Sequence, residues 1–172
     1  MPNLPGFPSR TVPHKLVVGW FSFTCCEDST ILFTELLNEH YDEWKKIIEF
    51  RSAKVLKSKN DMTGLDVAFI EGAISSEKQA AEVKKIRENS RYVVAIGSCA
   101  CTGKPSAARN DFVGPELNEK IRWYLSNFNY NQKVQKLDEV IKVDDQVNGC
   151  PMNTEIFLLT LQKYLKLFNI NE

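Results

Sequence analysis

The sequence predicts an α/β domain with a parallel sheet, because short apolar runs alternate with longer amphipathic ones along its 172 residues. The run at 16–21 is almost continuously apolar, as in strands that are covered on both faces. From Ser29 the apolar residues recur at helical spacing, with charged residues between them. A strand followed directly by an amphipathic helix is typical of β-α-β units.

The same patterns predict the other elements. Strands are expected at residues 16–21, 48–56, 66–70, 92–96 and 140–143. A first helix is expected from an N-cap at Asp28 or Ser29 to about residue 48. A second begins at a capping box formed by Ser76 and Gln79, and a last one begins near Asn153. This order predicts a sheet flanked by helices.

Two stretches are harder to assign. Residues 98–114 contain Gly103, Pro105 and Gly114, which interrupt regular structure, and they predict a long functional loop. The region 115–135 contains a group of aromatic residues, Trp123, Tyr124, Phe128 and Tyr130. It is either a helix followed by a covering loop or a surface for a partner, since aromatic residues are enriched in cores and in interfaces.

The charges argue against several classes of partner. Lysine plus arginine and aspartate plus glutamate number 22 each and are interspersed, so neither nucleic acid nor an anionic membrane is an expected partner. No window is long and apolar enough for insertion into a membrane. Residues 1–14 are rich in proline and predict an extended N-terminal arm rather than a signal peptide, ahead of a single domain at 15–172. We therefore expect a cytoplasmic protein.

Five cysteines indicate where the chemistry lies: Cys25, Cys26, Cys99, Cys101 and Cys150. They follow expected strands, and the carboxyl ends of parallel strands meet at one edge of a sheet. We therefore expect the fold to bring these sulfurs together. In a reducing compartment such thiols indicate metal or redox chemistry more than disulfides. Clustered thiolates select zinc or iron–sulfur clusters.

The residues alone leave three interpretations open: an iron–sulfur cluster, structural zinc, or inert buried thiols. The chain lacks the paired Cys-x-x-Cys knuckles of zinc ribbons. Gly97, Gly103 and Gly149 would let the backbone approach the sulfides of a cluster, and Pro151 after Cys150 repeats the Cys-Pro step found at cluster ligands. A bound nucleotide is not expected, because there is no G-x-G-x-x-G and no P-loop.

Four short blocks resemble the small subunits of nickel–iron hydrogenases. They are FSFTCCE at 21–27, FIEGAIS at 69–75, AIGSCA at 95–100 and VNGCP at 147–151, in the family's order. The superfamily includes the twenty-kilodalton cluster subunit of respiratory complex I. The short chain and the Glu-Gly-Ala-Ile block are more similar to the cytosolic hydrogenase branch, the sulfhydrogenase delta and viologen-reducing types.

The resemblance implies a flavodoxin-like domain that holds one [4Fe–4S] cluster beside a catalytic large subunit with the nickel–iron site. This chain would contribute no catalytic residue and would relay electrons to a further flavin or iron–sulfur subunit. Periplasmic relatives carry a C-terminal extension with two more clusters, so only the proximal cluster is expected here. The alternatives are a complex I-like assembly without nickel chemistry and a structural zinc scaffold.

The implied ligands include one departure from the family pattern. The family's first pair is normally Cys-x-x-Cys, and here Phe23 or Ser29 stands where one sulfur would be. The adjacent Cys25 and Cys26 instead resemble the tandem cysteines of the complex I subunit, where both ligate. The resemblance therefore implies four ligands, Cys25, Cys26, Cys99 and Cys150. Cys101 is then a thiol close to the cluster or an alternative ligand.

Two carboxylates in these blocks have two interpretations each. Glu71 is either a solvated or capping carboxylate or, as the resemblance implies, a group at the large-subunit interface that orients backbone near the cluster. Glu27 has the same functional interpretation, and otherwise compensates the dipole at a helix N-terminus. We expect Gly97, Gly103, Gly149 and Pro151 around the cluster as well.

Overall fold

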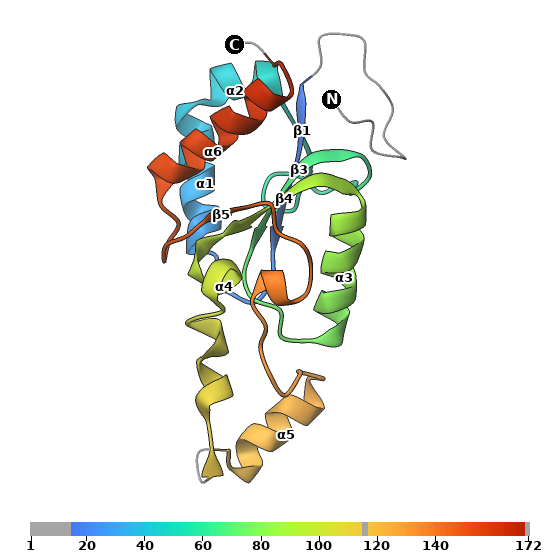
Figure 1. The fold of residues 1–172 in the computed structure, drawn as a ribbon, viewed down its shortest axis with the longest axis vertical. Helices are drawn as coiled ribbons and strands as arrows, with labels where there is room; N and C mark the ends of the chain where they lie inside the picture. Colours follow the sequence, from blue (N-terminus) through green and yellow to red (C-terminus); the bar gives the residue numbers. More distant parts are fainter. Residues whose placement is uncertain (1–14, 115–116, 171–172) are drawn as a thin grey trace.

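The computed structural model describes residues 15–114 and 117–170, and its centre is a five-stranded parallel sheet (Figure 1). The strand order is β2-β1-β3-β4-β5, which is the order of flavodoxin-like folds, so the fold prediction is confirmed. The predicted arm at 1–14 lies outside the described residues. The elements are β1 Leu16–Ser22, α1 Asp28–Glu39, α2 Tyr41–Ile47, β2 Ile48–Ala53, β3 Leu65–Glu71, α3 Glu77–Glu88, β4 Ser90–Ile96, α4 Gly97–Thr102, 3-10 helix η1 Ser106–Asp111, α5 Glu119–Asn127, 3-10 helix η3 Leu137–Glu139, β5 Asp145–Val147 and α6 Thr154–Leu167.

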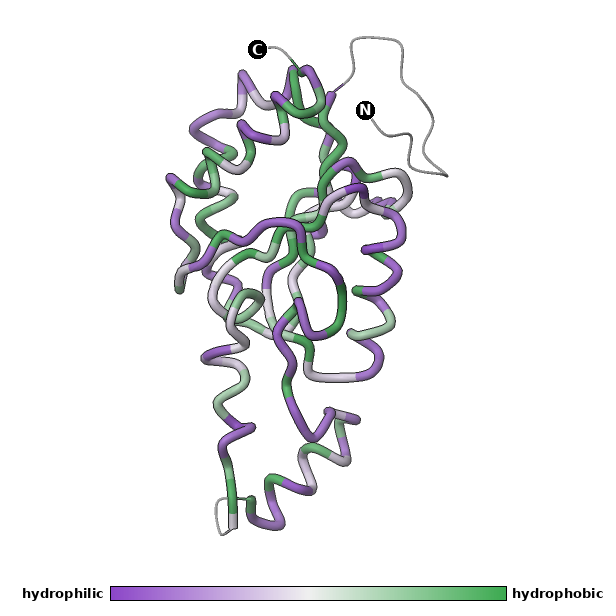
Figure 2. Tube along the Cα trace, in the orientation of Figure 1, coloured by the Kyte–Doolittle hydropathy of each residue, from purple (hydrophilic) through white to green (hydrophobic). Residues whose placement is uncertain are grey.

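The central strands are buried on both faces, which explains their continuous apolar sequences. In β1, Val18 and Trp20 point into one core, whereas Val17 and Phe21 point into the other, because successive side chains of a strand alternate. Helices α1, α2 and α6 cover the first face and α3 covers the second (Figure 1). Along these helices hydrophobic and hydrophilic segments alternate, as expected for one buried stripe (Figure 2). None of the described helices is long and apolar enough to span a membrane.

The first of these cores is built around aromatic rings. Trp20 stacks on Phe33 of α1 with ring centroids 4.1 Å apart, and Phe157 of α6 meets Trp20 edge-on at 5.9 Å. The indole N–H of Trp20 donates to Thr30 Oγ1 at 2.9 Å, so the polar atom of the buried ring has a partner. These contacts hold α1 and α6 against β1, and they thereby position the loop that joins β1 to α1.

The structure differs from several of the predictions about elements. The strand predicted at 48–56 ends at Ala53. The fifth strand is Asp145–Val147, and the apolar run at 140–143 packs instead into the core under α3. The first helix is divided at His40 into α1 and α2. The segment 98–114 is not a loop throughout, because it contains most of α4 and all of η1. Half of the predicted capping box is confirmed, since the Ser76 side chain accepts the N–H of Gln79. The Gln79 side chain accepts the N–H of Ser75 rather than that of Ser76.

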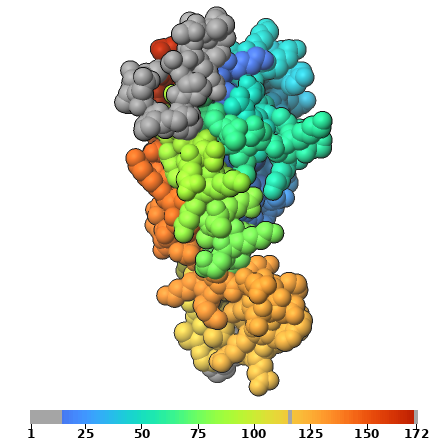
Figure 3. Space-filling model, turned by 90° about the vertical axis from the view of Figure 1, so that its right-hand side faces the viewer, coloured from blue at the N-terminus to red at the C-terminus, as the bar shows by residue number. Residues whose placement is uncertain are grey.

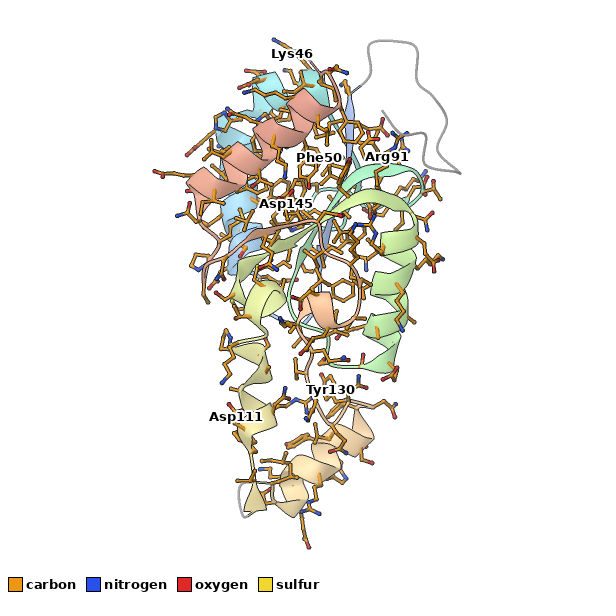
Figure 4. The ribbon with its side chains drawn as sticks, viewed as in Figure 1. Lys46, Phe50, Arg91, Asp111, Tyr130 and Asp145 are labelled. Carbon is orange, nitrogen blue, oxygen red and sulfur yellow. The ribbon has the colours of Figure 1, made fainter. Side chains whose placement is uncertain are left out.

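The region around α5 forms the lower end of the molecule, below the face that α3 covers (Figures 1 and 3). Leu125 of α5 is buried, whereas the predicted aromatic group is exposed: Trp123, Tyr124, Phe128 and Tyr130. Arg109 of η1 donates to the Asn131 carbonyl at 2.8 Å and so joins the descending and returning segments. Figure 4 shows Asp111 on the descending segment and Tyr130 on the returning segment at this lower end.

Replacing Phe33 by alanine tests the aromatic core. The ring is 1% exposed and stacks on Trp20, so Phe33→Ala should lower the free energy of unfolding by about 3–5 kcal/mol in urea titrations. The matched control is Phe112→Ala, because Phe112 is 39% exposed and its loss should change stability by less than about 0.5 kcal/mol. Equal effects of the two substitutions would contradict this description of the core.

Candidate metal centre

The site begins at one row of paired residues across the sheet. Ser22 of β1 pairs with Glu71 of β3, Glu71 pairs with Ile96 of β4, and Ile96 pairs with Val147 of β5. Because the strands are parallel, the chain leaves β1, β4 and β5 at the same edge. The segments that follow carry four cysteines, Cys25, Cys26, Cys99 and Cys150.

These segments enclose one pocket at that edge of the sheet. Cys99 is 6% exposed and Cys25 is half-buried, whereas Cys26 and Cys150 are exposed. Cys101 is not among the lining residues. The lining residues are Cys25, Cys26, Asp28, Ser29, Glu71, Ile96, Gly97, Ser98, Cys99, Gly149, Cys150 and Pro151. The structure therefore places four of the five cysteines around one pocket.

Hydrogen bonds join the three segments directly. The Ser98 N–H donates to the Gly149 carbonyl at 2.7 Å, and the Met152 N–H donates to Ser29 Oγ at 3.2 Å. Asn148 Oδ1 accepts from the Ser98 hydroxyl at 3.0 Å and from the Gly149 N–H at 2.8 Å. The sequence marks Ser29 as a candidate N-cap and as a position where a sulfur would be expected, and it does not single out Ser98 or Asn148. Asn148 before a glycine is at most a signal for a turn.

Two glycines let the backbone come close around the pocket. Gly97 has φ +76°, and a Cβ there would lie 2.9 Å from Ser29 Oγ. Gly149 has φ +129°, and a Cβ there would lie 2.4 Å from the Pro151 carbonyl oxygen. Any other residue would be strained and crowded at these positions. Gly103, also expected near the site, instead ends α4 in a left-handed conformation and does not line the pocket.

Glu71 borders the pocket and caps helix α1 from the neighbouring strand. Its carboxylate accepts the N–H groups of Ser29 at 3.2 Å and Thr30 at 3.1 Å, and the Thr30 hydroxyl at 2.6 Å. Glu71 is 3% exposed, and these bonds satisfy its buried oxygens. The prediction that Asp28 or Ser29 is the N-cap is wrong. The N-cap position is Glu27, whose side chain makes no capping bond.

Cys101 lies in the core on the other side of α4. Its Sγ is 3.6 Å from the Ala95 carbonyl oxygen, and it packs in the core under α3. Burial, and secondly the neighbouring Asp138 carboxylate, raise the pKa of this thiol to about 11. Cys99 and Cys101 are two residues apart on a helix, a rotation of about 200°, so their sulfurs point in different directions.

The sulfur donors that border the pocket are four cysteine side chains. Burial and then the Glu71 carboxylate raise the pKa of the Cys25 thiol to about 12, so a metal must displace a proton to bind this sulfur. Within the described residues, no three Cys, His, Asp or Glu side chains are close enough to hold one metal ion. A zinc ion takes four ligands within about 2.3 Å of itself, and a [4Fe–4S] cluster takes four thiolates on separate irons, so the donor set suits either group. Four cysteines around one pocket fit a cluster.

The family of the chain follows from the comparison with family models. The model of the NADH ubiquinone oxidoreductase 20 Kd subunit matches residues 25–164. The chain belongs to this family. The matched range begins at the first cysteine and extends into α6, so it contains all five cysteines and the whole pocket.

Two relatives of this member of the 20 Kd subunit family are hydrogenase subunits by name. One belongs to the F420-non-reducing hydrogenase of Methanothermobacter marburgensis and is 26% identical over 143 residues, 74% of this chain and 44% of that protein. The other, the sulfhydrogenase 2 delta subunit of Pyrococcus furiosus, is 26% identical over 143 residues, 80% of this chain and 57% of that protein. The chain thus spans about half the length of these relatives. The predicted resemblance to the hydrogenase branch of this superfamily is confirmed.

The fold is also similar to that of a solved structure. A chain in the crystal structure of an NAD+-reducing [NiFe]-hydrogenase in the H2-reduced state superposes with a TM-score of 0.75. The match covers 88% of this chain and 92% of that chain, at 20% sequence identity. At this identity the likeness shows the fold alone.

Replacing Glu71 by glutamine tests the cap. Glu71→Gln keeps the shape but removes the charge and turns an N–H group toward other donors. It should lower the free energy of unfolding by about 1–3 kcal/mol in urea titrations. Glu35→Gln, on the exposed side of α1, should change stability by less than about 0.5 kcal/mol. If Glu71→Gln is as stable as the unaltered chain, the cap contributes little.

Thiol alkylation tests the placement of the sulfurs. In metal-free protein, iodoacetamide in mildly alkaline buffer should modify the exposed Cys26 and Cys150 first. The buried Cys101, with its raised pKa, should react at least about tenfold more slowly, as followed by peptide mass spectrometry. In urea all five thiols should react at similar rates. Fast modification of Cys101 in the folded chain would show that it is not buried in the core.

Proposed function

We propose that this chain is the electron-transfer subunit of a cytoplasmic nickel–iron hydrogenase complex. In this proposal it holds one [4Fe–4S] cluster on Cys25, Cys26, Cys99 and Cys150. The observation that carries the proposal is that these four cysteines border one pocket, in a chain of the 20 Kd subunit family. The hydrogenase names of the relatives support the assignment to a hydrogenase. Five cysteines are too few for two such clusters, each of which takes four thiolates.

The residues around the pocket would position the ligands. The end of the sheet contributes the completely buried Ile96 and the buried Glu71 carboxylate to the lining. Helix α1 begins at Asp28, two residues after Cys26, and the Glu71 carboxylate accepts the N–H groups of Ser29 and Thr30 at its N-terminus, so this helix end already carries an anionic cap beside the pocket. A bound cluster takes up or releases one electron at a time, and the protein supplies its position and its surroundings.

The proposed partners are a large subunit with the nickel–iron site and a further flavin or iron–sulfur subunit. The exposure of Cys26 and Cys150 brings the pocket to the surface of this chain. A partner that docks over these two thiols would bring its own cofactor close to the cluster, and it would also exclude water from the ligands.

A second candidate is a cluster subunit of a complex I-like assembly without nickel chemistry. The adjacent pair Cys25 and Cys26 favours it, as does the NADH ubiquinone oxidoreductase family model. The sequence of the co-purifying large subunit distinguishes the two, because a nickel–iron site there needs two Cys-x-x-Cys pairs. A structural zinc scaffold is the third candidate, and it predicts one zinc and no iron in metal analysis.

Metal analysis of the unaltered chain and of two cysteine variants tests the proposed cluster. Anaerobic purification should yield about four irons and four sulfides per chain. Cys150→Ala should abolish the cluster, whereas Cys101→Ala should retain it, because Cys150 borders the pocket and Cys101 does not. Cys150 is exposed, so its removal leaves the core intact, and circular dichroism should show a folded variant.

Three outcomes would count against this assignment. A colourless protein without iron would remove the proposed function altogether. A folded Cys101→Ala chain that has lost its cluster would make Cys101 a ligand and Cys25 the surplus thiol. Retention of the full cluster by Cys150→Ala would show that the segment after β5 is not part of the ligand set.

A further inference from the structure

A serine hydroxyl from η1 lies against one of the pocket sulfurs. Ser106 Oγ is 3.2 Å from Cys99 Sγ and 2.9 Å from the Thr24 carbonyl oxygen. Ser106 is half-buried and Cys99 is 6% exposed, so water competes little for this contact. The hydroxyl thus touches both the segment after β4 and the segment that leads to Cys25.

The surrounding structure holds the hydroxyl at this place. Gly103 ends α4 and turns the chain, and its carbonyl accepts the Ala107 N–H at 2.7 Å. Ala107 is buried beside Cys99, Ala73 and Val134 in a small apolar cluster. Ser106 directly precedes this buried residue, and the packing of Ala107 helps to hold it beside Cys99.

The hydroxyl has one hydrogen and two acceptors within reach. The Thr24 carbonyl also accepts the Ala73 N–H at 3.0 Å, so it keeps a partner if Ser106 turns its O–H toward the sulfur. A thiolate is a stronger acceptor than a thiol or a neutral carbonyl, because it carries a charge. Once Cys99 is a deprotonated ligand, donation from Ser106 to Cys99 Sγ is the favoured arrangement.

We propose that Ser106 is a positioning residue that donates a hydrogen bond to the Cys99 sulfur and raises the reduction potential of the cluster. The inference rests on the proposed function, since it needs Cys99 to be a ligand. Reduction adds one electron to a group that is already negative, and a donor on a ligand sulfur stabilises the added charge. No covalent bond changes and no proton leaves Ser106, and the electron comes from the reductant of the titration.

The test is an EPR-monitored redox titration of the cluster in the purified chain. Ser106→Ala and Ser106→Gly both remove the hydroxyl, and each should lower the midpoint potential. A tenfold change in the equilibrium constant corresponds to about 59 mV for one electron, which sets the scale of the shift. Ser106→Thr retains the hydroxyl and should restore most of the potential. Thr102→Ala removes an exposed hydroxyl that bonds to Ser98 O, and it should leave the potential unchanged.

The outcomes separate this inference from the proposed function. If the unaltered chain holds no iron and sulfide, the proposed function fails and this inference fails with it. If loaded Ser106→Ala and Ser106→Gly keep the original potential, only the role of Ser106 is overturned. A lowered potential in Ser106→Thr, or loss of the cluster from both hydroxyl-free variants, would make Ser106 a packing contact and overturn it as well. If one hydroxyl-free variant does not fold, the other decides.

Discussion

The register of four parallel strands is the constraint on which the candidate centre depends. Ser22, Glu71, Ile96 and Val147 form one row across β1, β3, β4 and β5, and the cysteine-bearing segments leave this row at one edge. A slip of one residue between neighbouring strands would move a segment by about 3.3 Å and turn its side chains to the opposite face. The bonds among the three segments, such as that from Ser98 to the Gly149 carbonyl, could not form in that register.

The edge strand β5 is held in this register by carboxylates as well as by the buried Val147. Asp144, just before the strand, pairs with Arg87 of α3 at 2.6 Å. The carboxylate of Asp145 (Figure 4) accepts hydrogen bonds from Lys163 and Tyr164 of α6. Helices on opposite faces of the sheet thus hold the strand that leads to Cys150. Because two of the three residues of β5 are polar, the strand has no apolar pattern. The sequence therefore predicts the strand at the apolar run 140–143, just before it.

In the region after β4, glycine and proline residues predict a loop where the structure has a helix. Gly103, Pro105 and Gly114 predicted a loop at 98–114, but Gly97 begins α4 and Gly103 ends it, so the first of these residues marks the end of a helix. In a loop both Cys99 and Cys101 could have turned toward the site. On a helix they diverge, and Cys101 becomes part of the core under α3. The same turn at Gly103 brings Ser106 back onto the sulfur of Cys99.

By itself the sequence determined the α/β class, the three central strands and the four blocks that carry the family resemblance. These follow from local patterns, namely apolar runs, helical periodicity and cysteines placed soon after strands. Only the tertiary structure decided which sulfurs border the pocket, that Glu71 caps α1, and that the Ser106 hydroxyl lies against Cys99. Such outcomes depend on the directions of side chains from segments far apart in the chain, and those directions are set by packing and register rather than by local pattern.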